Sequence, residues 1–140
     1  MAACAPARKS PCAGLVYSDA GLTREQYAPC AKAMVVQLDR MHESLAVLGD
    51  AAQPKPARVK ARQACFAATS ALARLTAEAG GPEKLIHMRW EDATLSRFNY
   101  DVTAARDVYL MYCYYGLTGP EVAQMDSGHA SARIYAAALP

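Results

Sequence analysis

The chain has 140 residues and carries 15 basic and 13 acidic side chains, for a formal net charge of +2. This near balance argues against a nucleic-acid-binding protein. The length favours one domain, and no apolar run approaches the ~20 residues of a membrane span. Thirty of the hydrophobic residues are alanine, whereas Leu, Ile, Val and Phe together number 24. Since alanine is the strongest helix former, the composition predicts closely packed helices around a thin core.

The first 22 residues contain two prolines and two glycines and show no helical period. We expect an extended N-terminal arm over residues 1–22, followed by a single helical domain over residues 23–140. The residues that end at Cys4 can be interpreted in two ways. They are either an ordinary start of translation or the end of a bacterial lipobox, in which case Cys4 would carry the lipid.

The first helix has the most regular pattern in the sequence. Thr23 and Gln26 have the spacing of a capping box, and Pro29 suits a first helical turn. We therefore predict a helix over residues 29–48, ended by Gly49. Its apolar residues alternate in steps of four and three, which is the seam of left-handed helix packing; they are Tyr27, Ala31, Met34, Leu38, Met41, Leu45 and Leu48.

The second helix is predicted over residues 57–79, between a loop with two prolines and the pair Gly80-Gly81. Its stripe is dominated by small residues, which allow a neighbouring backbone to approach closely; it consists of Ala61, Cys65, Ala68, Leu72, Leu75 and Ala79. A basic stretch without intervening acids surrounds the helix start and consists of Lys55, Arg58, Lys60 and Arg62. It indicates either a contact to phosphate, an anionic lipid surface or an acidic partner, or simply a solvated helix start.

A third helical region extends over residues 82–115, where no proline or glycine follows the first residue. Its stripe is Leu95, Phe98, Val102, Ala105, Tyr109 and Tyr112. A single helix of this length would measure about 50 Å, much more than the first two. It would therefore either overhang the bundle or kink near residues 99–101, and we expect the overhang.

The C-terminal residues predict two short helical pieces. Pro120–Met125 follows a second capping signature, Ser127-Gly128 interrupts it, and Ser131–Leu139 is helical by composition. No alternating β-branched run predicts a strand. The expected fold is all-α: an antiparallel three-helix core with a long third helix and a short C-terminal helical element, resembling a four-helix bundle.

The five cysteines are scattered, without the spacing of a zinc or thioredoxin-type motif. If a disulfide forms, Cys12–Cys30 is the favoured pair, because both residues lie at or before the start of the first long helix. Cys65 has the character of a core residue. A straight third helix would hold Cys113 too far from Cys65 for a disulfide.

Candidate metal ligands are sparse. Asp39 and His42 have the i, i+3 spacing of half a di-iron motif, and Glu83, His87 and Glu91 share one helical face. The second motif of such a site is missing, so ordinary ion pairs on a solvated face are the favoured interpretation. No nucleophile elbow or phosphate loop occurs. We therefore expect no catalytic site, no cofactor and no small-molecule substrate.

An aromatic cluster at the end of the third helix is the most informative feature. Residues 109–115 are apolar around the whole helix circumference, so this end must be buried on all sides. Either another protein covers it, since tyrosine and methionine are enriched at interfaces, or the C-terminal segment folds back over it. The candidate partner-binding residues are Tyr109, Leu110, Met111, Tyr112, Tyr114 and Tyr115.

Taken together, these features predict a non-enzymatic helical interaction protein. Its expected role is a small accessory or structural subunit of a larger multi-protein assembly, inside the cell or an organelle, with other protein subunits as partners. The alternative is a periplasmic helical lipoprotein that acts as an inhibitor or binding module and is anchored through Cys4.

Overall fold

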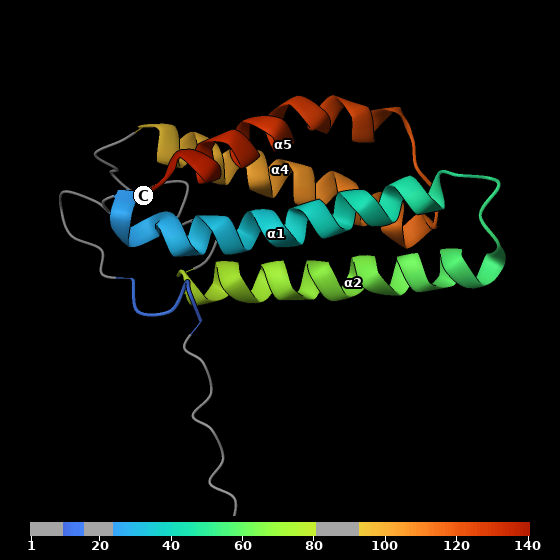
Figure 1. Cartoon of the computed structure of the whole chain (residues 1–140), viewed down its shortest axis with the longest axis horizontal. Coiled ribbons are helices and arrows are strands. Elements are labelled where there is room, and N and C mark those ends of the chain that lie inside the picture. The colour runs from blue at the N-terminus through green and yellow to red at the C-terminus, as the bar shows by residue number, and fades with distance from the viewer. Residues whose placement is uncertain (1–9, 16–23, 81–92) are drawn as a thin grey trace, which may run out of the picture.

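The described part of the chain forms an all-α bundle of four helices (Figure 1). The computed structural model describes residues 10–15, 24–80 and 93–140. Successive helices run in opposite directions, with α1 in contact with the other three and α4 in contact with α2 and α5. In these ranges no helix is both long and apolar enough to cross a bilayer. The helices are α1 (Arg24–Leu48), α2 (Lys55–Glu78), α4 (Ala93–Tyr115) and α5 (Pro120–Ala138).

Helix α1 buries its entire seven-residue stripe, as the heptad spacing predicts. The helix begins at Arg24 and not at Pro29, which lies inside it. Tertiary contacts explain the earlier start. Tyr27 is fully buried, and its ring meets Phe98 of α4 edge-on with centroids 6.0 Å apart. This packing offsets the one backbone hydrogen bond that Pro29 cannot donate. Thr23, the expected capping residue, lies outside the described residues.

Helix α2 begins two residues earlier than expected, at Lys55, with Pro56 in its first turn, where its missing N–H costs little. The small residues of its stripe are buried, and Leu75 is half-buried against the core. Helix α4 likewise buries every residue of its predicted stripe between Leu95 and Tyr112. The periodicity therefore predicted the inward faces of all three helices correctly.

The expected overhang of the third helix is wrong. Helix α4 is described from Ala93, runs without a break through residues 99–101, and ends at Tyr115 beside the first two turns of α2. Arg62 of α2 reaches the backbone carbonyl of Tyr114. The expected start at Pro82 lies outside the described residues. The position of α4 along the axis of α2 therefore does not follow from counting residues from the Gly80-Gly81 connection.

The exclusion of a Cys65–Cys113 disulfide is also wrong, because it assumed the same alignment of the second and third helices. The two residues form a disulfide with Cα atoms 6.2 Å apart. Counted along the helix axes, Cys113 lies about 30 Å from Ala93, and Cys65 lies about 20 Å from Glu78. Helices α2 and α4 are therefore offset by roughly 10 Å, where the expectation placed both helix ends at one level. Both sulfurs are buried, and the bond fixes the end of α4 against α2.

A second disulfide joins Cys12 to Cys30 of α1, with Cα atoms 4.6 Å apart; this is the pair that the sequence favours. Residues 11–14 form a turn in which Gly14 has a φ of 75°. Leu15 then packs against the core. The turn is therefore attached to the bundle, and residues 1–9 and 16–22 of the expected arm lie outside the described ranges.

Helix α5 is one continuous helix over Pro120–Ala138, so the expected break at Ser127-Gly128 is wrong. The C-terminal element, which was expected to be short, is therefore long enough to be the fourth helix of the bundle. Gly128 faces Asp101 of α4, and a Cβ there would lie 3.4 Å from the Asp101 carboxylate. The packing of α5 on α4 offsets the cost of about 1 kcal/mol that a glycine adds to a helix.

Candidate functional site

The aromatic end of α4 is divided into an inner and an outer half. Tyr109 and Tyr112 are buried, and Leu110 is half-buried against the core. Met111, Tyr114 and Tyr115 are 40%, 65% and 61% exposed. Of the residues proposed for partner binding, only these three face solvent.

Helix α5 and the turn before it cover the inner half. A Cβ on Gly119 would lie 2.5–2.7 Å from atoms of the Tyr112 ring, so only glycine allows the ring to pack there. The Tyr112 hydroxyl donates to the Glu121 carboxylate. This hydrogen bond raises the pKa of Tyr112 and lowers the pKa of Glu121. The C-terminal segment thus folds back over part of the cluster and leaves the rest uncovered by described residues.

The end of α4 has the hydrogen bonds of a Schellman motif. Gly116, with a φ of 72°, donates its N–H to Cys113, and Leu117 donates to Tyr112 over 3.2 Å each. The motif turns the chain so that Leu117 is 45% exposed. We call the four exposed apolar residues at this end the outer patch: Met111, Tyr114, Tyr115 and Leu117.

The basic stretch at the start of α2 also divides. Lys60 points away, into a groove between α1 and α2 that it shares with Arg40 and Glu43. The other three cations face a pocket of about 430 Å³ between α2 and the end of α4. We call it the basic pocket; it is lined by Leu48, Lys55, Arg58, Val59, Arg62, Tyr115 and Gly116.

The basic pocket joins residues of the α2 start to Tyr115, which follows the last of them, Arg62, by 53 residues. Tyr115 belongs both to the pocket wall and to the outer patch. Arg62 donates to the Tyr114 carbonyl and lies over the Phe66 ring at 5.7 Å, so it ties the end of α4 to α2. The aromatic end and three of the four predicted basic residues therefore form one continuous surface.

The charge of the basic pocket is not balanced by its own lining. None of its lining residues is acidic, and the first turn of α2 contains no acid. Lys55, Arg58 and Arg62 form no ion pair with a carboxylate among the described residues. The positive end of the α2 dipole adds to this charge. The pocket therefore combines a positive electrostatic potential with apolar walls.

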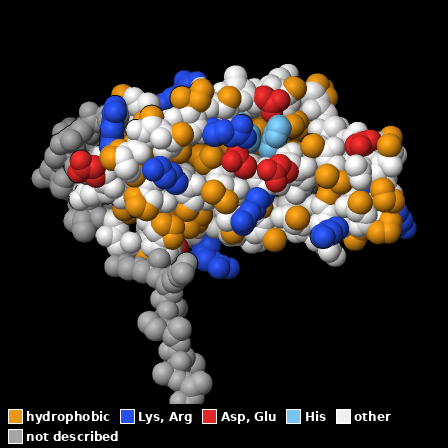
Figure 2. Space-filling view, viewed as in Figure 1, with side chains coloured by type: hydrophobic (Ala, Val, Ile, Leu, Met, Phe, Trp, Pro, Cys, Tyr) orange, Lys and Arg blue, Asp and Glu red, His pale blue; other side chains and the backbone are white. Residues whose placement is uncertain are grey.

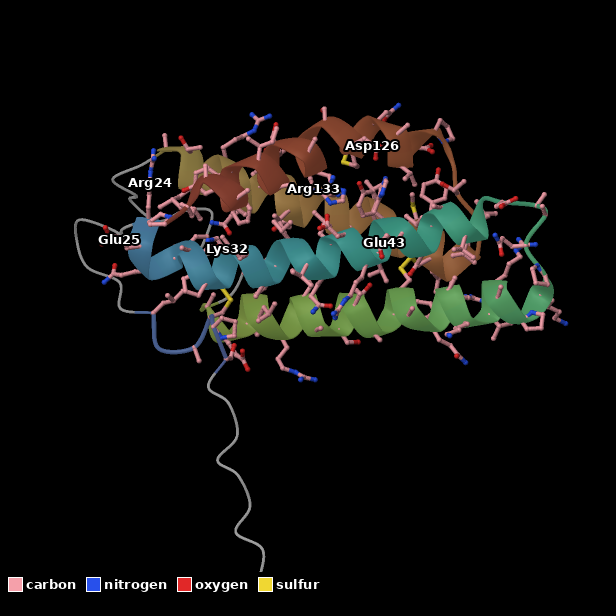
Figure 3. The ribbon with its side chains drawn as sticks, in the orientation of Figure 1. Arg24, Glu25, Lys32, Glu43, Asp126 and Arg133 are labelled. Carbon is pink, nitrogen blue, oxygen red and sulfur yellow. A yellow bond between two sulfur atoms is a disulfide. The ribbon has the colours of Figure 1, made fainter. Side chains whose placement is uncertain are left out.

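A second cluster of ionisable groups lies between α1, α4 and α5. We call it the polar network: Asp39, His42, Tyr109, Asp126, His129 and Arg133. Figure 2 shows acidic, basic and histidine side chains gathered on the face over α1 and α5. In Figure 3, Arg133 reaches from α5 toward α1.

His129 is the centre of the polar network. Its Nε2 lies 2.7 Å from an Asp39 oxygen and its Nδ1 lies 3.0 Å from the Tyr109 hydroxyl. A neutral imidazole satisfies both contacts by donating to the carboxylate and accepting from the hydroxyl. Arg133 donates to the same Asp39 oxygen over 2.8 Å. Asp126 lies 3.1 Å from His42 and 3.4 Å from the Tyr109 hydroxyl, whose single proton is shared between Asp126 and His129.

This arrangement of carboxylate, imidazole and hydroxyl matches the order of groups in a hydrolytic triad. Tyr109, however, is fully buried. Burial, together with the nearby Asp126 carboxylate, raises the pKa of Tyr109. Burial lowers the pKa of His129, an effect that Asp39 opposes. A buried phenol with a raised pKa is not positioned to attack a substrate, so these contacts connect the three helices.

The structure also shows what the candidate metal ligands Asp39 and His42 contact. Asp39 contacts His129 and Arg133, while His42 contacts Asp126. Among the described residues, no group of three or more His, Cys, Asp or Glu side chains could hold a metal ion. Glu83, His87 and Glu91 lie outside these ranges.

The sequence predicted neither the polar network nor the apolar walls of the basic pocket. Asp126, His129 and Arg133 have helical i, i+3, i+7 spacing, but the expected break at Ser127-Gly128 separated the first from the others. Leu48 and Val59 were not associated with the basic residues, because only the offset of α2 and α4 brings them to Tyr115.

Comparisons of the chain with protein-family models, with curated proteins and with solved structures found no match.

Proposed function

We propose that the chain is a non-enzymatic helical interaction protein that docks another protein through the outer patch. The observation that carries the proposal is the gathering of four large apolar side chains, each at least 40% exposed, at the end of α4. Its role would be that of a small accessory subunit of a larger assembly.

The composition of the outer patch supports this role. Tyrosine supplies a large contact area with few rotatable bonds and is enriched among the residues that dominate binding energy. Tyr114 and Tyr115 stand edge-on with centroids 5.9 Å apart, and Tyr115 contacts Tyr112 in the same way. The buried Tyr112 thus supports the exposed pair, which reduces the conformational entropy lost when a partner binds.

A photo-crosslinking experiment in the native source tests this proposal. A photoreactive phenylalanine at Tyr114 should give one discrete adduct, and the same group at Tyr100, which is 56% exposed on the same helix, should give none. Met111→Glu should abolish the adduct. Ile134→Glu, a change at an exposed site of α5, should preserve it. Equal labelling from both positions, or an adduct that survives Met111→Glu, would contradict docking at the outer patch.

The two disulfides favour a second candidate, the periplasmic helical binding module. Cys12–Cys30 and Cys65–Cys113 are buried, and disulfides persist mainly in oxidising compartments. The periplasm is such a compartment, whereas the bacterial cytosol keeps thiols reduced. This candidate uses the same outer patch and differs in location and anchoring.

Thiol alkylation of the protein from its native source separates the two candidates. Under denaturing conditions without reductant, we expect mass spectrometry to find Cys12, Cys30, Cys65 and Cys113 protected from alkylation. After reduction these four should react, whereas Cys4 should react in neither sample if it carries the lipid. Alkylation at all five sites before reduction would contradict an oxidising compartment and favour the intracellular subunit.

A further inference from the structure

We infer that the basic pocket binds an acidic segment of the partner protein, with carboxylates beside Lys55, Arg58 and Arg62 and an apolar side chain against Leu48, Val59 and Tyr115. This inference rests on the proposed function and names the chemistry of the partner. Tyr115 carries the connection, because its side chain lines the pocket and belongs to the outer patch. One partner can therefore cover both surfaces continuously.

Charge is the first argument. Three other arginines of the described helices have their own carboxylates, within 2.8–3.2 Å; these pairs are Arg97–Asp101, Arg106–Asp107 and Arg133–Asp39. The three cations of the basic pocket have none in the described part of the chain, and two of them stand in the first turn of α2, where positive charge opposes the helix dipole. An anionic partner removes this repulsion.

Spacing is the second argument. Lys55, Arg58 and Arg62 follow one another at i, i+3 and i+7, so they lie on one face of α2 over about 10 Å. Alternate side chains of an extended segment lie about 6.6 Å apart on one face. Two acidic residues separated by one or three positions therefore match the cations, and the length of chain needed is about five residues.

The pocket walls exclude a purely ionic ligand as the best fit. Val59 and Tyr115 are 48% and 61% exposed, and Leu48 is buried behind them. Covering these apolar groups contributes about 25 cal/mol per Å² removed from water, which a hydrated inorganic anion cannot provide. A concave recess also suits an inserted side chain better than a flat lipid surface. The favoured ligand is acidic and apolar at once.

Two peptides test the inference on the full chain with both disulfides intact. Fluorescence anisotropy would compare neutral-dye-labelled Ac-Glu-Glu-Trp-Glu-Glu-NH2 with its Gln-Gln-Trp-Gln-Gln counterpart. We expect the acidic peptide to bind at least tenfold more tightly, with an affinity that falls as salt rises. Arg58→Glu should weaken it at least tenfold. Lys60→Glu, the same charge change on the same helix outside the pocket, should alter affinity less than twofold. Arg62 is left unchanged because it holds the Tyr114 carbonyl.

The alternatives give different results. Equal binding of the two peptides, or equal effects of Arg58→Glu and Lys60→Glu, would overturn the inference. A lipid surface would be the ligand instead if the acidic peptide failed to bind while vesicles of equal phosphatidylglycerol and phosphatidylcholine bound to the unaltered chain and not to Arg58→Glu. That result would also overturn the inference. If the peptides fail but the Tyr114 crosslink remains specific, the acidic ligand is wrong and docking at the outer patch stands. If the crosslink fails and the acidic peptide binds, the pocket is an anion site without the proposed partner.

Discussion

The polar network and the basic pocket both contain charged side chains, but only the network pairs them with opposite charges of the same chain. In the network, Asp39 accepts from His129 and Arg133, so its charge is balanced within the chain. In the pocket, Lys55 and Arg58 face a recess without an acidic lining residue. Burial differs as well, since His129 is 3% exposed whereas Tyr115 is 61% exposed. Ionisable residues that are satisfied by neighbours hold the bundle together, and those left unmatched at a recess are available to a partner.

The largest expected effect is on the disulfide that holds the end of α4, and with it the pocket wall, against α2. Replacing Cys65 and Cys113 by alanine should lower the free energy of unfolding by about 2–4 kcal/mol, since the bond restricts the unfolded chain over 48 residues. Chemical denaturation would measure it. The matched pair Cys12→Ala/Cys30→Ala closes a separation of 18 and should cost about 1 kcal/mol less. A larger loss from that second pair would contradict the chain-entropy account.

The next effect separates the two regions by a single hydroxyl. Tyr109→Phe leaves Nδ1 of the buried His129 without its donor, which should cost about 1–3 kcal/mol in denaturant unfolding. Tyr115→Phe removes a hydroxyl at an exposed site and should change stability by less than about 0.5 kcal/mol. Similar losses in both variants would show that the network does not stabilise the bundle more than the pocket does.

The sequence predicted the buried faces because helical periodicity depends only on which residues are apolar. Every residue of the α1 stripe is buried, and the α4 stripe between Leu95 and Tyr112 is buried completely. Helix ends were less predictable, because they depend on tertiary contacts. Tyr27 packs on Phe98 and extends α1 beyond Pro29, and Gly128 is retained in α5 by its packing against Asp101.

The site depends on the relative level of two helices, and local sequence does not encode that level. The residue types at the aromatic end and in the basic stretch were identified, but their contact follows from the offset that places Tyr114 beside Arg62. The same offset produces the Cys65–Cys113 bond. A bond between these two cysteines fixes the end of α4 against α2, and the pocket follows from that position. The inner position of Tyr109 also required α5 as one helix, since His129 and Asp126 lie on either side of the supposed break.

Acidification should affect the polar network and leave the pocket unchanged. Burial lowers the pKa of His129 in the folded protein, where the ionisable groups around it are Asp39 and His42 of α1, Tyr109 of α4 and Arg133 of its own helix, with Asp126 beyond Tyr109 and His42. The unfolded chain therefore binds a proton more readily. The contribution of His129 is complete above about pH 6.5, its unfolded pKa, and declines as the pH falls below it.

The slope for this one group cannot exceed about 1.4 kcal/mol per pH unit. Urea unfolding at pH 7.5 and 5.5 should show the decline in the unaltered chain, and a smaller decline in His129→Gln. Arg58→Glu, which alters the pocket, should retain the full decline. An identical pH dependence in His129→Gln would assign the acid sensitivity to other groups.

The smallest expected effect is the most direct measure of unmatched charge. Lys55→Ala removes a cation from the first turn of α2, where neither a carboxylate nor the helix dipole stabilises it. Stability should therefore stay within about 0.5 kcal/mol of the unaltered chain, with any change in the stabilising direction at low salt and none at high salt. His42→Ala provides the contrast, since it removes a partly exposed contact to Asp126 and should cost at most about 1 kcal/mol. If Lys55→Ala were the more destabilising of the two, Lys55 would already be neutralised within the chain, and an acidic partner would gain nothing from the pocket.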